Sequence, residues 1–278
     1  MALIACAGAV AVAALIFLTW LLAFHVASFE RADMSILRGF TDLHRPRVDS
    51  VARFIAGLCN PNPYVYFAGA VVLLALARKR PGVALVIAGI ILGANVTTQL
   101  LKPLLAAPRA VPAGTYEIAA AAWPSGHATA AMSLALCSVL AVPARLRPAV
   151  AALGAAFAVA VSYSFLTLNW HYPSDVLGGF LVATMWTLLG IAVLFALRAR
   201  FTAAASVDPA RRPSMRQALR PPAVALLGGI AAAALVALAR PHAVVAYAQS
   251  HTAFVIGACA IAAAGLVLAT GVMLALRR

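Results

Sequence analysis

The chain has 278 residues, of which 64% are hydrophobic and 10% charged, and this composition excludes a soluble globular protein. The net charge of +14 comes mainly from short basic segments between long apolar runs, a pattern that follows the positive-inside rule and argues against a nucleic-acid partner. The apolar runs are as long as helices and lack the alternation of barrel strands. The sequence therefore predicts an all-α polytopic protein embedded in the membrane bilayer.

Eight apolar segments of helix length follow one another along the chain. They are Leu3–Phe24, Tyr64–Ala77, Val83–Leu101, His127–Val142, Pro148–Leu168, Pro173–Leu197, Ala223–Ala239 and Thr252–Leu276. We interpret residues 1–197 as a six-helix membrane core and residues 198–222 as a basic cytoplasmic linker. Residues 223–278 are expected to form two additional transmembrane helices.

The polar stretch Glu30–Asn62 interrupts this pattern after the first apolar segment. Apolar residues recur in it at helical spacing, first from Ile36 to Leu43 and again from Val51 to Leu58. This spacing predicts two short amphipathic helices, which lie in the membrane interface, cover the bundle as a lid, or do both.

Three polar clusters stand at the ends of predicted spans in the middle of the chain: Lys102–Arg109, Pro124–His127 and His171–Asp175. Two predicted spans separate the second cluster from the third, so the chain returns to the membrane face that it left. Two basic groups, two histidines, a serine and a carboxylate that meet at one face suggest a phosphate site with its own nucleophile.

Phosphoryl transfer to a histidine requires a neutral imidazole, a carboxylate that holds its tautomer, donors around the phosphate oxygens and an acid for the leaving oxygen. His171 with Asp175 supplies the first pair, if Asp175 lies one turn into its helix. His127 is the candidate acid. Ser125 and the Gly126 amide lie beside a predicted helix N-terminus, which favours anions.

The clusters resemble the motifs of the type 2 phosphatidic acid phosphatase (PAP2) superfamily, the membrane lipid phosphate phosphatases. The family pattern is K-x6-R-P, P-S-G-H and S-R-x5-H-x3-D. The corresponding residues are Lys102-x6-Arg109, Pro124-Ser125-Gly126-His127 and Ser164-x6-His171-x3-Asp175. Any one of these motifs is weak by itself, but three in order at spacings compatible with a membrane bundle are specific.

The resemblance implies a role for each matched residue. The family's nucleophile falls on His171, the carboxylate that orients it on Asp175, and the leaving-group acid on His127. Its phosphate-binding groups fall on Lys102, Arg109, Ser125 and Gly126. The resemblance also implies that no metal and no other cofactor takes part. The implied substrate is a phosphorylated membrane lipid, such as phosphatidic acid, phosphatidylglycerol phosphate, a sphingoid phosphate or a polyprenyl (pyro)phosphate.

The sequence departs from the family pattern at two positions. Ala110 follows Arg109 where the family has proline, a minor change because Pro108 already stiffens the turn. Phe165 stands where the third motif has arginine, and the loss of such a contact to phosphate costs about 2–4 kcal/mol of transition-state stabilisation.

Several groups could replace the missing guanidinium. The candidates are Asn169 and the arginines predicted at the same face, namely Arg31, Arg38, Arg45, Arg47, Arg53 and Arg240. The remaining explanations are a different headgroup or weak activity.

The distribution of charge predicts the orientation in the membrane. With the N-terminus inside, the inner loops and tail hold 13 Lys or Arg residues and one acidic residue, against 8 and six for the outer loops. This excess predicts that the polar clusters face outward. The abundance of alanine and arginine suggests a bacterial source, and hence a bacterial cytoplasmic membrane.

We therefore expect a lipid phosphate phosphatase that works through a phosphohistidine on His171. Two other functions fit the same residues: a lipid phosphotransferase, and a catalytically weakened protein that binds a polyprenyl-phosphate carrier. A zinc site formed by His127, His171 and Asp175 is a further alternative, disfavoured because Lys102 and Arg109 would repel the ion. The sequence does not indicate an oligomeric state.

Overall fold

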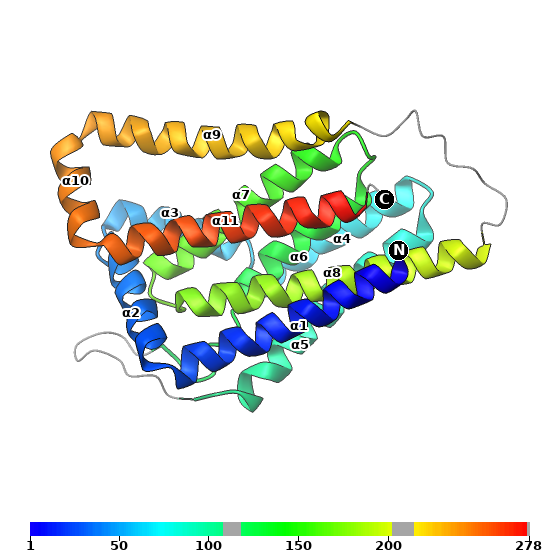
Figure 1. Cartoon of the computed structure of the whole chain (residues 1–278), viewed down its shortest axis with the longest axis horizontal. Helices are drawn as coiled ribbons and strands as arrows, with labels where there is room; N and C mark the ends of the chain where they lie inside the picture. The colour runs from blue at the N-terminus through cyan, green and yellow to red at the C-terminus, as the bar shows by residue number, and fades with distance from the viewer. Residues whose placement is uncertain (108–117, 202–213, 277–278) are drawn as a thin grey trace.

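The secondary structure consists of helices throughout the residues that the computed structural model describes, which are 1–107, 118–201 and 214–276 (Figure 1). Each of the eight predicted spans is a helix. They are α1 (Ala2–His25), α4 (Pro61–Ala77), α5 (Pro81–Leu104), α6 (Gly126–Ala141), α7 (Arg147–Thr167), α8 (Pro173–Phe201), α9 (Met215–Ala239) and α11 (Thr252–Ala275). The predicted all-α bundle is confirmed.

Six of these helices are long and apolar enough to cross a membrane by length and composition, so the chain is a multi-pass membrane protein. The exceptions are α4, with 17 residues, and α6, with 16. Helix α6 packs on α4, α5, α7 and α8, and most of its side chains are buried. Because protein rather than lipid surrounds α6, it does not need the full length of a lipid-facing span.

The long helices run side by side along the long axis of the molecule (Figure 1). Both chain ends lie at one end of the bundle, whereas α2 (Ala27–Thr41) and α10 (Pro241–Ser250) lie across the other end. Helix α8 forms the centre of the bundle and contacts α1, α5, α6 and α11. The segments that carry the predicted site begin or end near α2.

The two amphipathic helices predicted in the polar stretch 30–62 are present. They are α2 and α3 (Pro46–Gly57), and α2 turns Leu37 and Phe40 into the protein core. Helix α3 packs on α7 and helix α2 on α7, α8 and α11. These contacts fit the interpretation of the two helices as a cover over the bundle.

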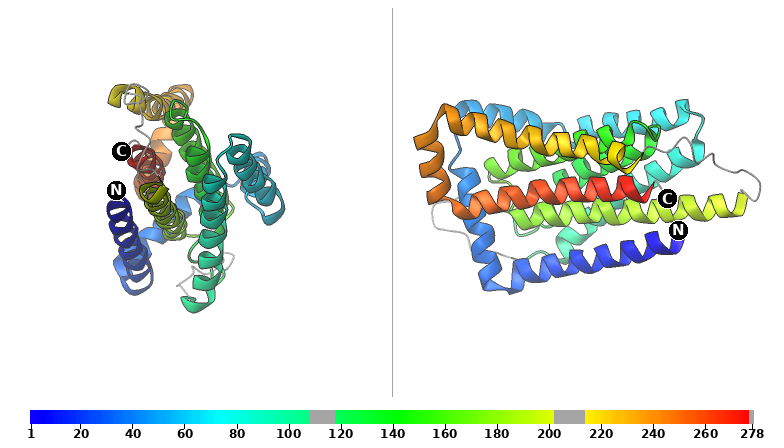
Figure 2. Two further views of the ribbon diagram at one scale, coloured as in Figure 1. Left: turned by 90° about the vertical axis from the view of Figure 1, so that its right-hand side faces the viewer. Right: turned by 45° about the horizontal axis from the view of Figure 1, so that its top comes forward.

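The C-terminal helices differ in how closely they join the rest of the chain. Helix α11 packs against α2, α7 and α8, whereas α9 contacts α7 and buries Ala218 and Pro222 near its start. Figure 2 shows α9 on the opposite side of the bundle from α1. The division into a core over 1–197, a linker over 198–222 and two extra helices over 223–278 stays a prediction.

Candidate active site

The N-terminus of α6 is built by its own sequence. Ser125 is the N-cap residue, and its Oγ accepts a hydrogen bond from Ala128 N at 3.3 Å. Its carbonyl oxygen accepts from Thr129 N at 3.0 Å. The N–H groups of Gly126 and His127 are thereby left at the open end of the helix, where they and the helix dipole favour an anion.

The end of α7 sets the position of His171. Asn169 adopts a left-handed conformation, with φ of 58°, which asparagine tolerates better than most residues. Its N–H bonds to Leu166 O and the N–H of Trp170 bonds to Phe165 O, both at 3.0 Å. These two bonds form a Schellman motif, which stops α7 and directs the chain toward His171.

The start of α8 supplies the carboxylate. The helix begins at Pro173, as its sequence predicts, and Asp175 lies in the first turn with no exposed surface. Asp175 Oδ2 lies 3.2 Å from Nδ1 of His171 and accepts from Tyr172 N at 3.0 Å. Because the carboxylate accepts a hydrogen bond from the protonated Nδ1, the unprotonated Nε2 of His171 remains as the nucleophilic atom.

Helices α6 and α8 meet closely at this point. The N–H of Ser125 donates to the backbone oxygen of Asp175 at 3.0 Å. A Cβ atom on Gly179 would come within 2.6 Å of Ser125 O and 2.9 Å of Thr129 N. Only glycine allows this approach, which brings the start of α6 beside the start of α8.

The two histidines of the predicted site lie near each other in an edge-to-face arrangement, with ring centres 6.4 Å apart. An attacking atom approaches its target to about 3–3.5 Å, and an acid lies about 2.6–3.2 Å from the oxygen that it protonates. The rings of His127 and His171 therefore lie close enough to act on the same phosphoryl group.

Of the two basic residues of the first motif, only Lys102 lies in the described part of the chain. Lys102, near the end of α5, is half-buried, and its Nζ would lie 3.8 Å from a Cβ atom on Gly126. It is also within electrostatic range of Asp175 and His127. The structure thus places Lys102 beside the N-terminus of α6. Arg109 lies outside the described residues.

Phe165 fills the place where the third motif has arginine. It has no exposed surface, and its ring centre lies 5.2 Å from that of His171 in an edge-to-face arrangement and 6.0 Å from that of His127. The ring therefore packs directly against both histidines. This side of the site is apolar instead of cationic.

Two polar residues near the site were not identified from the sequence. Asn60 Oδ1 lies 3.0 Å from Nε2 of His127, and because an amide oxygen only accepts, this nitrogen carries a proton. Asp33 of α2 bonds to Ser174 at the start of α8. Neither contact can be predicted from a local sequence pattern, because its two partners lie far apart along the chain.

The cysteine beside Asn60 is not a competing nucleophile. Burial raises the pKa of the Cys59 thiol to about 12, so the thiol stays protonated at neutral pH. Among the described residues, no hydrogen bond joins the Cys59 thiol to His127 or His171.

A cavity of about 600 Å³ opens next to the loop between α7 and α8. Its wall includes Arg53, His44, Asn169 and Trp170, and the ring of Trp170 lies 5.7 Å from that of His127. Two of the groups that could replace the missing guanidinium, Arg53 and Asn169, therefore line a space beside the histidines.

The alternative of a zinc site receives no support. Within the described part of the chain, no three His, Cys, Asp or Glu residues are placed so that they could hold a metal ion together. The pairing of His171 with Asp175 instead matches the arrangement expected for an oriented nucleophile.

Comparison with known proteins finds a match to one family. Residues 80–199, which run from the start of α5 into the end of α8, match the PAP2 superfamily. Over this stretch the chain is similar to that superfamily. The matched stretch contains the His127, His171 and Asp175 positions of the site.

A solved structure with a similar fold is the first transmembrane PAP2 type phosphatidylglycerolphosphate phosphatase from Bacillus subtilis. The likeness has a TM-score of 0.51 at 18% sequence identity and covers 68% of this chain and 96% of the other. It concerns the fold, and this chain has segments beyond the shared part. No curated protein matches the chain.

Proposed function

We propose that the protein is a lipid phosphate phosphatase that hydrolyses a phosphomonoester or pyrophosphate of a membrane lipid. The observation that carries this proposal is the buried His171–Asp175 pair facing His127 at the open end of α6. A nucleophile with a fixed tautomer, an acid close to it and a helix N-terminus together form the minimum machinery for phosphoryl transfer.

The reaction proceeds in two steps. Nε2 of His171 attacks phosphorus while Asp175 holds the proton on Nδ1, and the bond to the leaving oxygen breaks as the imidazolium form of His127 donates a ring proton to that oxygen. Water then attacks phosphorus, the bond between phosphorus and Nε2 of His171 breaks, the neutral His127 accepts a proton from the water, and inorganic phosphate leaves. Lys102, Ser125, the Gly126 amide and, by its motif position, Arg109 hold the phosphate oxygens.

Arg53 is proposed as the cation that replaces the missing guanidinium. It stands with Asn169 in the wall of the cavity beside the histidines, where a headgroup of the lipid would enter. Arg53→Gln is expected to raise KM about tenfold, because one charge-assisted contact is lost. Arg38→Gln, at an exposed arginine of α2, is the matched control. Equal KM values in the two variants would refute the role of Arg53.

The site is proposed to face the outside of a bacterial cytoplasmic membrane. The basic segment 78–80, just before α5, lies at the end of the bundle opposite to α2 and α10, and the positive-inside rule favours a cytoplasmic position for that end (Figure 1). Substrates are then the phosphorylated lipids of the outer leaflet.

A weakened protein that binds a polyprenyl-phosphate carrier is the second candidate. Phe165 favours it, because a ring packed on both histidines removes a positive charge from the phosphate site. This candidate predicts that lipid phosphate binds without being hydrolysed.

The deciding experiment measures phosphate release by the purified protein from a panel of lipids. The panel contains phosphatidic acid, phosphatidylglycerol phosphate and C55 polyprenyl phosphate and pyrophosphate, with His171→Ala and Phe165→Arg beside the wild type. Release that His171→Ala abolishes establishes the phosphatase. No release by the wild type, with a gain in Phe165→Arg, establishes the weakened protein. Phosphate transferred to an added lipid alcohol instead of water indicates the transferase.

A further inference from the structure

The first turn of α8 is held by a side chain from another helix. Asp33 of α2 accepts two hydrogen bonds from Ser174, one from its N–H at 2.9 Å and one from its Oγ at 2.6 Å. Asp33 is 4% exposed and Ser174 1% exposed. The contact is therefore a buried carboxylate at a helix N-terminus, where the helix dipole favours negative charge.

Ser174 lies between the two residues of the proposed catalytic pair. His171 precedes α8, Asp175 follows Ser174 in its first turn, and both Nδ1 of His171 and the N–H of Tyr172 reach Asp175 Oδ2. Any rotation of this turn would move the carboxylate relative to the imidazole. Two bonds to one neighbouring residue, one of them to its backbone, resist such a rotation.

We propose that Asp33 is a positioning residue, which fixes the first turn of α8 so that Asp175 orients His171. Asp33 accepts hydrogen bonds from both donors of Ser174, while the neighbouring Asp175 contacts His171 and Tyr172. The proposal rests on the function proposed above, because it gives Asp33 a part in the same reaction. It adds a residue from α2, outside the three motifs.

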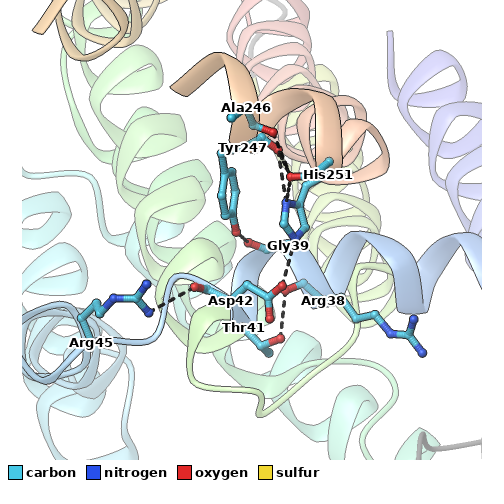
Figure 3. A network of polar contacts seen from close by, with 9 residues as sticks. Arg38, Gly39, Thr41, Asp42, Arg45, Ala246, Tyr247 and His251 are labelled. Atoms are coloured by element: carbon cyan, nitrogen blue, oxygen red, sulfur yellow. Dashed lines mark hydrogen bonds and ion pairs between the residues drawn. The ribbon is translucent and has the colours of Figure 1, made fainter. Parts of the chain in front are cut away.

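Asp33 can position α8 only if α2 is itself held in place, and the C-terminal helices supply that support. Figure 3 shows Tyr247 of α10 donating to the backbone oxygen of Gly39, and Nε2 of His251 lies 2.9 Å from Asp42 Oδ2. Burial, together with the Asp42 carboxylate, raises the pKa of Tyr247, so its hydroxyl keeps the proton that it donates.

Packing reinforces these polar contacts. The ring of Phe254 in α11 lies 4.8 Å from that of Phe40, and a Cβ atom on Gly39 would collide with the side chain of Phe254. Helices α2 and α11 therefore touch at a glycine that admits an aromatic ring. The two C-terminal helices that contact α2 thus brace the element that carries Asp33.

The test compares Asp33→Asn with Asp42→Asn. Both variants remove a carboxylate that joins α2 to another helix, but only Asp33 contacts α8. The amide in Asp33→Asn keeps at most one of the two bonds from Ser174, because its nitrogen cannot accept. We expect kcat to fall about 10- to 100-fold with KM changed less than about twofold, since a small misplacement of reacting groups has an effect of this size. Asp42→Asn is expected to change kcat less than about twofold, because the bond from Tyr247 to Gly39 and the packing of Phe254 on Phe40 still hold α2 in place.

A second readout does not require activity. In protein labelled at its histidines, the nitrogen NMR resonance of His171 Nδ1, assigned by its loss in His171→Ala, reports the hydrogen bond to Asp175. We expect this resonance to move in Asp33→Asn and to stay in place in Asp42→Asn. An unchanged resonance in Asp33→Asn overturns the positioning role, even if the wild type releases phosphate. If the resonance moves in Asp33→Asn but the wild type releases no phosphate, the positioning role is supported and the phosphatase is refuted.

Ser174→Ala provides a milder variant should Asp33→Asn fail to fold. It removes one of the two bonds and leaves the backbone bond in place. We expect a smaller fall in kcat, and the double variant should be no slower than Asp33→Asn alone, because both changes break the same contact. Fully additive effects of the two substitutions on kcat would contradict a role through Ser174.

Discussion

Helices α8 and α9 look alike as sequences but have opposite environments in the molecule. Each is a long apolar helix that contains two adjacent glycines, Gly178 with Gly179 in α8 and Gly228 with Gly229 in α9. In the most apolar stretch of α8, 44% of the residues are buried, compared with 6% in α9. Added Cβ atoms on the α8 glycines would collide with the turn that carries Ser125, whereas those on the α9 glycines would meet nothing within 4 Å.

This difference shows that a pair of glycines in an apolar helix has no fixed meaning. In α8 the pair permits the close contact with α6 on which the site depends. In α9 the same pair faces away from the rest of the described chain, where packing places no demand on it. Paired substitutions, one near the site and one in or near α9, therefore separate effects on the site from effects on any membrane helix.

The largest difference is expected between two histidines. His171→Ala, just before α8, should reduce phosphate release at least about 1000-fold, because the nucleophile is removed. His242→Ala, at an exposed histidine that follows α9, should leave the rate unchanged. The rate of phosphate release from the preferred lipid, measured with matched amounts of each variant, checks both. Substantial release by His171→Ala would disprove the phosphohistidine mechanism.

Two glycine substitutions should differ next most. Gly179→Ala forces a methyl group against Ser125 O and should lower kcat about 100-fold, because α6 moves away from α8 and misplaces His127. Gly229→Ala has open space and should preserve kcat while raising the free energy of unfolding by up to about 1 kcal/mol, since alanine is the better helix former. Thermal unfolding in detergent and kcat are measured for both. Equal kcat values would mean that the contact at Gly179 is not needed for activity.

The smallest difference is expected between two N-cap serines. Ser125 caps α6 and Ser214 caps α9, each accepting from a backbone N–H of the first turn. Replacing either by alanine should lower the free energy of unfolding by about 1 kcal/mol. Only Ser125→Ala should also lower kcat/KM, by about tenfold, because its hydroxyl is proposed to contact the phosphate. If both variants kept full kcat/KM, the part of Ser125 in substrate binding would be wrong.

The sequence alone determined the features that depend on neighbouring residues. The apolar runs predicted all eight long helices, and the spacing in 30–62 predicted α2 and α3. Ser125 as a cap, Pro173 at the start of α8 and the pairing of His171 with Asp175 also follow from residues within one turn of each other. Such contacts form whenever the local helix forms, so a linear pattern is enough to predict them.

Only the tertiary structure decided which distant segments meet. It placed Asp33 on Ser174, Asn60 on His127 and the ring of Phe165 against both histidines. It also packed α11 against α2 while it left most of α9 exposed, although both are apolar helices of similar length. Hydropathy shows that a helix prefers an apolar environment, and lipid and protein both satisfy that preference. The choice between them depends on how all the helices fit together in three dimensions.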